Sequence, residues 1–313
     1  MEPLEHLAPI VLFVYKRPEH TLQTLESLHQ NPLSGQSSLY IFADAAKSDQ
    51  DQASVNQVRE IIRQKQWCKE VHIIERAHNF GLAKNIIEGV TQIVQQFGKV
   101  IVLEDDLVVS SSFLHYMNQA LQAYQHQAQV MQVSGHVPPI KFNNYSPDTF
   151  FYNKIATWGW GTWASAWQQL NTDTSYLLEQ IKTTGQTIAF NADGAYDFIA
   201  HLEANIQGTL NTWAIKWQAS VFLKQGLCLY PGTSLVRNIG FDNSGEHCGH
   251  STLYLTQKIA EKINFEPITV EELPQVRKVM TKHYEQLAVP PSWLQRLKTK
   301  ALVFIRGQSG KSH

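Results

Sequence analysis

The sequence predicts an α/β fold with an open, mostly parallel sheet and helices on both faces. Short apolar runs rich in β-forming residues recur up to about residue 137, and amphipathic segments with helical spacing separate them. Such alternation is typical of βαβ units, whose strands pair in parallel. A chain of 313 residues can form one large domain of this kind or two closely joined domains.

Five apolar runs are the expected strands, and four helices alternate with them. Pro18 suits the first turn of a helix, and Gly98 follows the last apolar residue of another. The strands are expected at residues 10–15, 38–43, 71–74, 100–103 and 130–134. The helices are expected from residue 18 and over 51–66, 82–97 and 113–124.

The second half of the chain is rich in tryptophan and loops, and the strand–helix rhythm ends there. Helices are expected around 160–168, 193–206 and 211–225. We therefore divide the chain into an α/β half (1–137), a second half of the same domain (138–250) and a C-terminal helical extension (251–313).

Charge and cysteine content narrow the class of protein. The 26 basic and 27 acidic residues give a net charge of −1, which disfavours a nucleic-acid groove. The three cysteines cannot all pair and lack metal-site spacing. The amino terminus shows no signal-peptide pattern, and no apolar run is long enough to span a bilayer. We expect a reduced, cytoplasmic protein that binds no nucleic acid.

Three adjacent carboxylates, Glu104, Asp105 and Asp106, directly follow the apolar run at 100–103. In a parallel sheet, ligands bind outside the carboxyl ends of the strands. Hard divalent ions prefer oxygen ligands and often bridge a carboxylate to substrate phosphates. The alternative is an acidic cap for the helix that starts near Ser110, and the sequence leaves both readings open.

The run V-I-V-L-E-D-D-L-V-V-S-S-S-F-L-H-Y-M at 100–117 resembles the N-acetylglucosaminyltransferase I family. The chain is also similar to bacterial family-2-like relatives that build surface polysaccharides. The resemblance implies a GT-A (Rossmann-like) fold and inverting, metal-dependent transfer from UDP-N-acetylglucosamine. Five further stretches resemble segments of the same family in the same order, at 9–18, 41–49, 79–90, 157–167 and 231–247.

The resemblance assigns roles to residues at the strand ends. It implies that Asp106 binds Mn²⁺ (or Mg²⁺), that Asp105 lies near the ribose and that Glu104 contacts the donor sugar. Asp44 matches an aspartate that pairs with the uracil edge, and a carboxylate can accept the uracil N–H. Arg17 matches an arginine near the diphosphate, where a guanidinium suits phosphate oxygens. For Arg17 and Asp44 the alternative is ordinary surface charge.

A second group of donor-site candidates lies before the triplet and in the tryptophan-rich segment. Asn79, Gly81 and Lys84 begin the helix at 82–97, where a helix N-terminus favours anions, although plain helix capping explains them too. Trp158 and Trp160 are flanked by glycines, so we expect a sugar-binding or acceptor wall there. Trp163 and Trp167, one helical turn apart, are expected in the core.

The general base is the point at which the chain departs from the family. The family has W-D-D-W, in which the first Asp is the base, whereas this chain has Leu210-Asn211-Thr212-Trp213. An asparagine cannot take a proton at neutral pH, and inversion needs a deprotonated acceptor hydroxyl. The substitutes are Asp242, Glu246 and Glu203. His247, in the same glycine-rich loop as the first two, is a candidate contact to the metal or diphosphate.

The last segment, 292–313, has an apolar stripe and five basic residues. A basic amphipathic helix is typical of membrane-surface binding, and the alternative is a helix packed on the catalytic domain. We expect a peripheral contact with the inner face of the cell membrane.

The sequence therefore predicts a UDP-sugar glycosyltransferase that acts on a glycan or lipid-linked acceptor in surface polysaccharide synthesis. One alternative is a nucleotidyltransferase, although the usual Gly-rich phosphate loop after the first strand is missing. The other is a non-catalytic glycan-binding protein on a degenerate GT-A fold, which Asn211 favours.

Overall fold

The computed structural model describes residue 4 and residues 6–142, 147–242 and 252–288. Its centre is an eight-stranded sheet in the order β3-β2-β1-β4-β8-β6-β9-β7. The strands are β1 Ile10–Val14, β2 Ser38–Ala43, β3 Glu70–Glu75, β4 Lys99–Glu104, β6 Val130–Ser134, β7 Thr149–Tyr152, β8 Trp160–Trp163 and β9 Leu227–Pro231. The mixed α/β fold with a mostly parallel sheet is thus confirmed.

All five strands expected from the sequence are present. β1, β2, β3 and β4 are parallel neighbours, and Leu12 of β1 is paired with Ile41 on one side and Leu103 on the other. β1 is buried along its whole length, which explains why it is continuously apolar rather than alternating.

One element differs in type from the expectation. Residues 160–168 were expected as a helix, but Trp160–Trp163 form strand β8, and only Ala164–Trp167 form a short helix, α5. β8 is antiparallel to β4, pairing Trp160 with Val102, and also to β6. Pairing on both sides decides the conformation of this Trp-Gly-Thr-Trp segment, because strand preference depends strongly on tertiary context.

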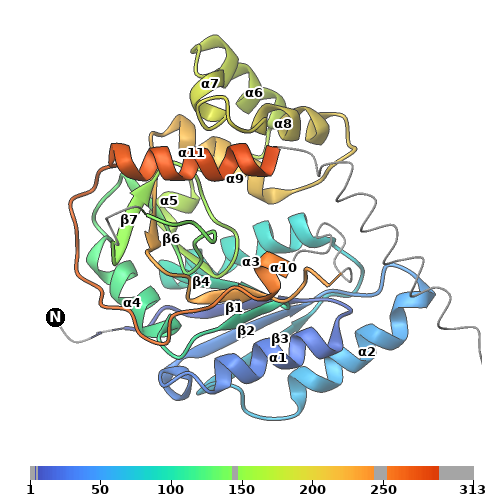
Figure 1. Ribbon diagram of the computed structural model, residues 1–313. Helices are drawn as coiled ribbons and strands as arrows, with labels where there is room; N and C mark the ends of the chain where they lie inside the picture. The colour runs from blue at the N-terminus through green and yellow to red at the C-terminus, as the bar shows by residue number, and fades with distance from the viewer. Residues whose placement is uncertain (1–3, 5, 143–146, 243–251, 289–313) are drawn as a thin grey trace, which may run out of the picture.

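Helices cover both faces of the sheet. α1 (Pro18–His29) packs against α2 (Asp49–Arg63), and the two lie below the sheet in the view of Figure 1. α3 (Leu82–Phe97) lies above it and contacts α5 and α9. Helix α4 spans Phe113–Ala123 and contacts β6 and β8.

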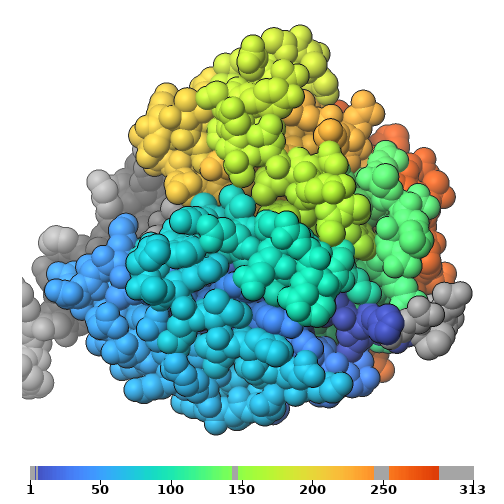
Figure 2. Space-filling model, turned by 180° about the vertical axis from the view of Figure 1, so that it is seen from behind, coloured from blue at the N-terminus to red at the C-terminus, as the bar shows by residue number. Residues whose placement is uncertain are grey.

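The second half adds a helical cluster with a core of its own. Its members are α6 (Thr174–Thr183), α7 (Thr187–Phe190), α8 (Phe198–Ile206) and α9 (Trp213–Leu223). Seen from behind, its yellow and yellow-green segments form the upper part of the molecule, above the blue and cyan amino-terminal half (Figure 2).

Capping residues explain why two of these helices start later than the sequence pattern indicated. The expected helix at 193–206 begins at Phe198, since the Asp197 side chain accepts the N–H of Ala200. The expected helix at 211–225 begins at Trp213, since the Thr212 hydroxyl accepts the N–H of Ala214. Both caps satisfy a donor that the first helical turn leaves free.

Two short strands and two further helices complete the described chain. β5 (Leu107–Val109) pairs antiparallel with β10 (Val236–Asn238) in a separate two-stranded ribbon. α10 (Thr252–Leu255) contacts β10, and α11 (Pro274–Ala288) packs on β7. Among all the residues that the structure describes, no helix is both long and apolar enough to cross a membrane.

Candidate functional site

The carboxyl ends of β1 and β4 meet at the centre of the sheet. The chain runs outward from β1 to β2 and β3 on one side, whereas β4 lies on the other side of β1. Such a reversal of strand order opens a crevice at the carboxyl ends, where open α/β sheets bind ligands. Arg17 follows β1 and the carboxylate triplet ends β4, so the fold places them together.

Arg17 bridges two of the three carboxylates. Its Nη2 contacts Asp105 Oδ1 in a short ion pair and lies 2.9 Å from Asp106 Oδ2. Both aspartates are almost fully buried, and the arginine side chain is 19% exposed. The structure thus brings Arg17, Asp105 and Asp106 together and gives Arg17 direct carboxylate partners.

The charges at this point are crowded. Burial and the neighbouring Asp106 and Asp105 raise the pKa of Glu104 to about 8. Burial, and secondarily the charge of Asp105, also raises the pKa of Asp106, although Arg17 opposes the shift. A divalent cation would favour the ionised forms of these groups, so their environment suits one.

The chemistry of the described side chains limits how such a cation could be held. Asp105 and Asp106 supply hard oxygen ligands, but no cluster of three or more His, Cys, Asp or Glu in the described ranges could hold a metal by itself. These residues therefore fit a cation that is shared between one or two carboxylates and the phosphates of a substrate.

The segment after β10 closes over the triplet. The Ile239 N–H donates to the Asp106 carbonyl at 2.9 Å. A Cβ atom on Gly240 would lie 2.2 Å from Asp106 Oδ2 and 2.9 Å from Arg17 Nη1, so a larger residue here would have to displace the Asp106 and Arg17 side chains. Two residues later, Asp242 Oδ2 lies 3.1 Å from His20 Nε2. Asp242 is 41% exposed, which leaves its carboxylate accessible to a substrate.

Asp44, at the end of β2, has a network of partners within the protein. Its Oδ1 accepts the N–H groups of Ala45 and Phe80, each at 2.9 Å. Its Oδ2 accepts the Gly81 N–H at 2.9 Å and the Asn79 side-chain amide at 3.2 Å. A carboxylate can accept about four hydrogen bonds, so these partners occupy all of its acceptor positions. Asp44 therefore ties the end of β2 to the loop that starts α3.

This network predicts the effect of Asp44→Ala. Buried N–H groups that lose their acceptor cost about 1–3 kcal/mol each, so we expect a lower free energy of unfolding in a denaturant titration. We also expect UDP and GDP binding to weaken alike, since the loop rather than the base contact is lost. A loss confined to uridine nucleotides would restore the uracil-reading role expected from the sequence.

The other residues at the start of α3 divide into two groups. Asn79 and Gly81 are held by Asp44, and Gly81 has a φ of 71°, which favours glycine. Lys84 instead lies on the exposed face of α3, where its Nζ is 3.7 Å from Glu88 Oε1. The structure thus brings Asn79 and Gly81 to the strand ends and gives Lys84 an ordinary i,i+4 partner.

A cavity of about 660 Å³ lies beside the Asp44 network, at the carboxyl ends of β2 and β3. Its lining includes the donors Lys47, Gln52, Arg59 and Arg76 and the acceptor Glu75. These groups can donate hydrogen bonds to a polar ligand and accept hydrogen bonds from it.

Aromatic rings line the other side of the triplet. Trp158 lies edge-on to Phe241 and Tyr254, with ring centroids 5.4 Å and 5.1 Å away. The His136 ring is 4.4 Å from that of Trp158, and its Nε2 has no hydrogen-bond partner among the described residues. Burial lowers the pKa of His136 to about 3, so the ring is neutral. The rings of Trp158, Phe241 and Tyr254 are partly exposed, whereas that of His136 is buried. We call these four rings the aromatic wall; that Trp158 contacts a sugar or acceptor there stays a prediction.

Trp160 does not belong to that wall. It was expected in a sugar-binding or acceptor wall, but it lies in β8, is fully buried and stacks on Trp213 with centroids 5.0 Å apart. Its strand pairs with β4 and β6, which directs the indole into the core rather than toward the crevice. Trp163 and Trp167 are buried as expected.

Only one of the candidate bases lies beside the carboxylate triplet in the described part of the chain. Asp242 lies beside the triplet, as described. Glu203 lies on α8, where Lys182 Nζ is 2.9 Å from its Oε1, and nothing in the described part of the chain joins it to the carboxylates. Asn211 is exposed, just before the cap of α9. Glu246 and His247 lie outside the described residues.

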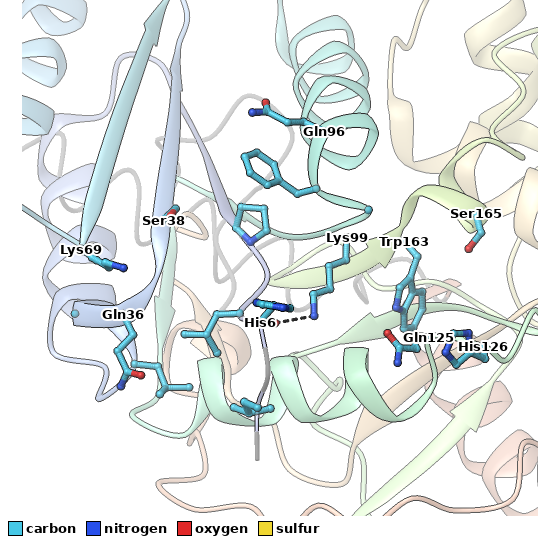
Figure 3. Close-up of a pocket in the computed structure, with 17 residues that line it drawn as sticks. His6, Gln36, Ser38, Lys69, Gln96, Lys99, Gln125, His126, Trp163 and Ser165 are labelled. Atoms are coloured by element: carbon cyan, nitrogen blue, oxygen red, sulfur yellow. Dashed lines mark hydrogen bonds between the residues drawn. The ribbon is translucent and has the colours of Figure 1, made fainter. Parts of the chain in front are cut away.

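A separate cavity of about 1130 Å³ lies at the opposite, amino-terminal edge of the sheet (Figure 3). His6, Lys69, Lys99 and His126 are among its lining, and Lys99 Nζ donates to the His6 carbonyl at 2.7 Å. None of the binding or catalytic residues predicted from the sequence lies there, although Trp163, which was expected in the core, contributes to its lining. The strand ends that carry Arg17 and the triplet point away from it.

Sequence reasoning missed several residues that the fold brings to the crevice. His20 lies one turn into α1, after Arg17, and its position was the available signal. His136 follows β6, whose carboxyl end lies at the same edge as that of β4, because both strands are antiparallel to β8. Phe241 and Tyr254 offered no pattern of their own.

Comparison with known proteins gives a family. The profile described as glycosyl transferase family 2 matches residues 10–189, which is more than half of the chain. A search of the curated proteins found no match.

Several solved structures are similar to this chain at low sequence identity. The mannosyltransferase PcManGT from Pyrobaculum calidifontis, in complex with GDP-Man and Mn²⁺, is 10% identical (70% of this chain, 75% of that chain, TM-score 0.37). The galactosyltransferase LgtC, in complex with donor and acceptor sugar analogues, is 11% identical (56% and 65%, TM-score 0.31). TarS from S. aureus is 15% identical (45% and 25%, TM-score 0.28).

Proposed function

This chain belongs to glycosyltransferase family 2 and is a nucleotide-sugar glycosyltransferase, and on that premise we propose that it is inverting, metal-dependent and specific for a UDP-sugar. UDP-N-acetylglucosamine is the proposed donor, from the resemblance to the N-acetylglucosaminyltransferase I family. The acceptor is a glycan or a lipid-linked glycan in surface polysaccharide synthesis, and 292–313 would hold the enzyme at the inner face of the membrane.

The observation that supports this proposal best is the meeting of Arg17 with Asp105 and Asp106 at the reversal of strand order. A guanidinium binds phosphate oxygens, and adjacent carboxylates suit a cation that also binds phosphate. The crevice therefore has the groups that a nucleoside diphosphate needs. We assign the base to the polar cavity at the ends of β2 and β3 and the sugar to the aromatic wall, because the cavity offers hydrogen-bonding groups and the rings can stack on a sugar.

The residues divide the work of an inverting transfer. Asp106, with Asp105, would hold Mn²⁺ or Mg²⁺, which supplies charge neutralisation at the diphosphate. Asp242 takes the proton of the acceptor hydroxyl as its oxygen attacks the anomeric carbon. The bond from that carbon to the diphosphate breaks, and UDP leaves with the electron pair. Arg17 binds the leaving diphosphate, and His20 orients Asp242.

Asp242→Asn tests the assignment of the base. We expect turnover to fall by about 10²–10⁴-fold, since an amide cannot take the proton, while UDP affinity stays nearly unchanged. Glu203→Gln, which changes a carboxylate on α8, is the matched control and should turn over like the parent. Asn211→Asp should be tolerated. If Asp242→Asn is as active as the parent and Glu246→Gln is not, the base is Glu246.

A panel of nucleotide sugars tests the function as a whole. Release of UDP from UDP-N-acetylglucosamine should require Mn²⁺ or Mg²⁺ and should stop in chelator. Release of GDP from GDP-mannose should be slower. Equal rates with all donors would contradict the proposed specificity. Binding without any transfer or donor hydrolysis would favour the glycan-binding alternative. Release of pyrophosphate from UTP and a sugar 1-phosphate would instead favour a nucleotidyltransferase.

A further inference from the structure

We propose that Arg17 occupies the cation site from within the chain, so that it competes with the divalent cation for Asp105 and Asp106 until the donor diphosphate draws it away. This inference rests on the proposed function, because it needs a site that binds both a cation and a nucleoside diphosphate. It makes Arg17 a coupling residue as well as a phosphate ligand.

The contacts of Arg17 place it in the position that a bound cation would need. One nitrogen, Nη2, is shared between Asp105 Oδ1 and Asp106 Oδ2, which is the bridging position that a cation between the two carboxylates would take. The Asp106 backbone is held by the Ile239 N–H, and Gly240 packs against both the Asp106 carboxylate and the guanidinium. The space around Asp106 Oδ2 is therefore narrow, so a cation must displace the guanidinium rather than bind beside it.

The positive charge of Arg17 should also weaken the binding of a cation. With Arg17 in place, its positive charge opposes the approach of a second cation, and two like charges a few ångström apart repel strongly in a partly buried site. The cation should consequently bind weakly to the enzyme alone.

A nucleoside diphosphate changes this balance. Its phosphate oxygens are alternative partners for the guanidinium, and they also complete the coordination of the cation. Each ligand then increases the affinity of the other, and linkage requires the factor to be the same in both directions. Part of this coupling should be lost when a neutral residue replaces Arg17.

Arg17→Met tests the proposal on the full chain, with Lys16→Met as the matched control. Lys16 is the adjacent residue, so its replacement removes the same charge, but its Nζ pairs with Asp51 at 2.8 Å and not with the triplet. Mn²⁺ binding is measured from the electron paramagnetic resonance signal of the free ion, with and without UDP. Without UDP, Arg17→Met should bind Mn²⁺ about tenfold more tightly than the parent. Lys16→Met should stay within about twofold, since its charge lies outside the pair.

The coupling is the second readout. UDP should raise the Mn²⁺ affinity of the parent by a larger factor than that of Arg17→Met. The melting temperature is a third readout. In chelator, Arg17→Met should melt at a lower temperature than the parent, and Mn²⁺ should raise its melting temperature by more. Arg17→Gln should behave in the same way, and a variant that folds only with Mn²⁺ would support the exchange.

The outcomes separate this inference from the proposed function. A parent that binds no Mn²⁺ even with UDP overturns both. A parent that binds Mn²⁺ with UDP, together with an Arg17→Met of unchanged or weaker Mn²⁺ affinity without UDP, overturns only the competition. Variants at Arg17 that remain unfolded in Mn²⁺ would also overturn it, since the cation would then be unable to replace the guanidinium.

Discussion

Asp106→Asn will reduce sugar transfer by about 10²–10⁴-fold, because a bound cation contributes several kcal/mol to the transition state and about 1.4 kcal/mol corresponds to tenfold in rate. The amide keeps the size of the side chain but removes the charge that holds the cation. UDP affinity should therefore no longer depend on Mn²⁺. Calorimetric titration of UDP, in Mn²⁺ and in chelator, measures that dependence.

Asp193→Asn is the matched control for this change. Asp193 also forms an ion pair with an arginine, Arg277, but it lies in the turn before α8. It should transfer sugar like the parent. A metal-dependent UDP affinity that persists in Asp106→Asn would remove Asp106 from the cation site, and tight UDP binding by the parent in chelator would argue against metal dependence itself.

Trp160→Ala will lower the free energy of unfolding by about 3–5 kcal/mol, since it leaves a cavity in a packed core. The side chain is fully buried between Trp167 and Trp213. Its Nε1 has no acceptor in the described part of the chain, so Trp160→Phe, which keeps most of the ring contacts, should cost much less. Denaturant titration of both variants gives the comparison.

Trp158→Ala should show the opposite behaviour. Its ring is partly exposed beside Phe241, so its loss should weaken acceptor or sugar binding more than it weakens the fold. A raised KM with nearly unchanged stability would place it at the substrate. A large loss of stability in Trp158→Ala together with a tolerant Trp160→Ala would reverse the two assignments.

The predicted fold came from local patterns, and those were sufficient for the first half. A buried parallel strand such as Ile10–Val14 must be continuously apolar, and an amphipathic helix such as Leu82–Phe97 must repeat every three to four residues. Both rules can be read from neighbouring residues. β8 could not be identified in this way, because its strand pairing depends on β4 and β6, which are distant in the sequence.

The site divides along the same line. The sequence predicted that Arg17 follows the first strand and that three carboxylates lie at the end of β4, since charged residues after an apolar run mark the edge of the sheet. Their partners, however, depend on the tertiary structure. Arg17 and Asp105 are 88 positions apart, and they meet because β1 and β4 are neighbours in the sheet. In the same way, Asp242 reaches His20 through the β5–β10 ribbon, and Asp44 binds backbone N–H groups beyond β3. A sequence pattern records what each residue can do, whereas the order of strands decides which of these residues share one crevice.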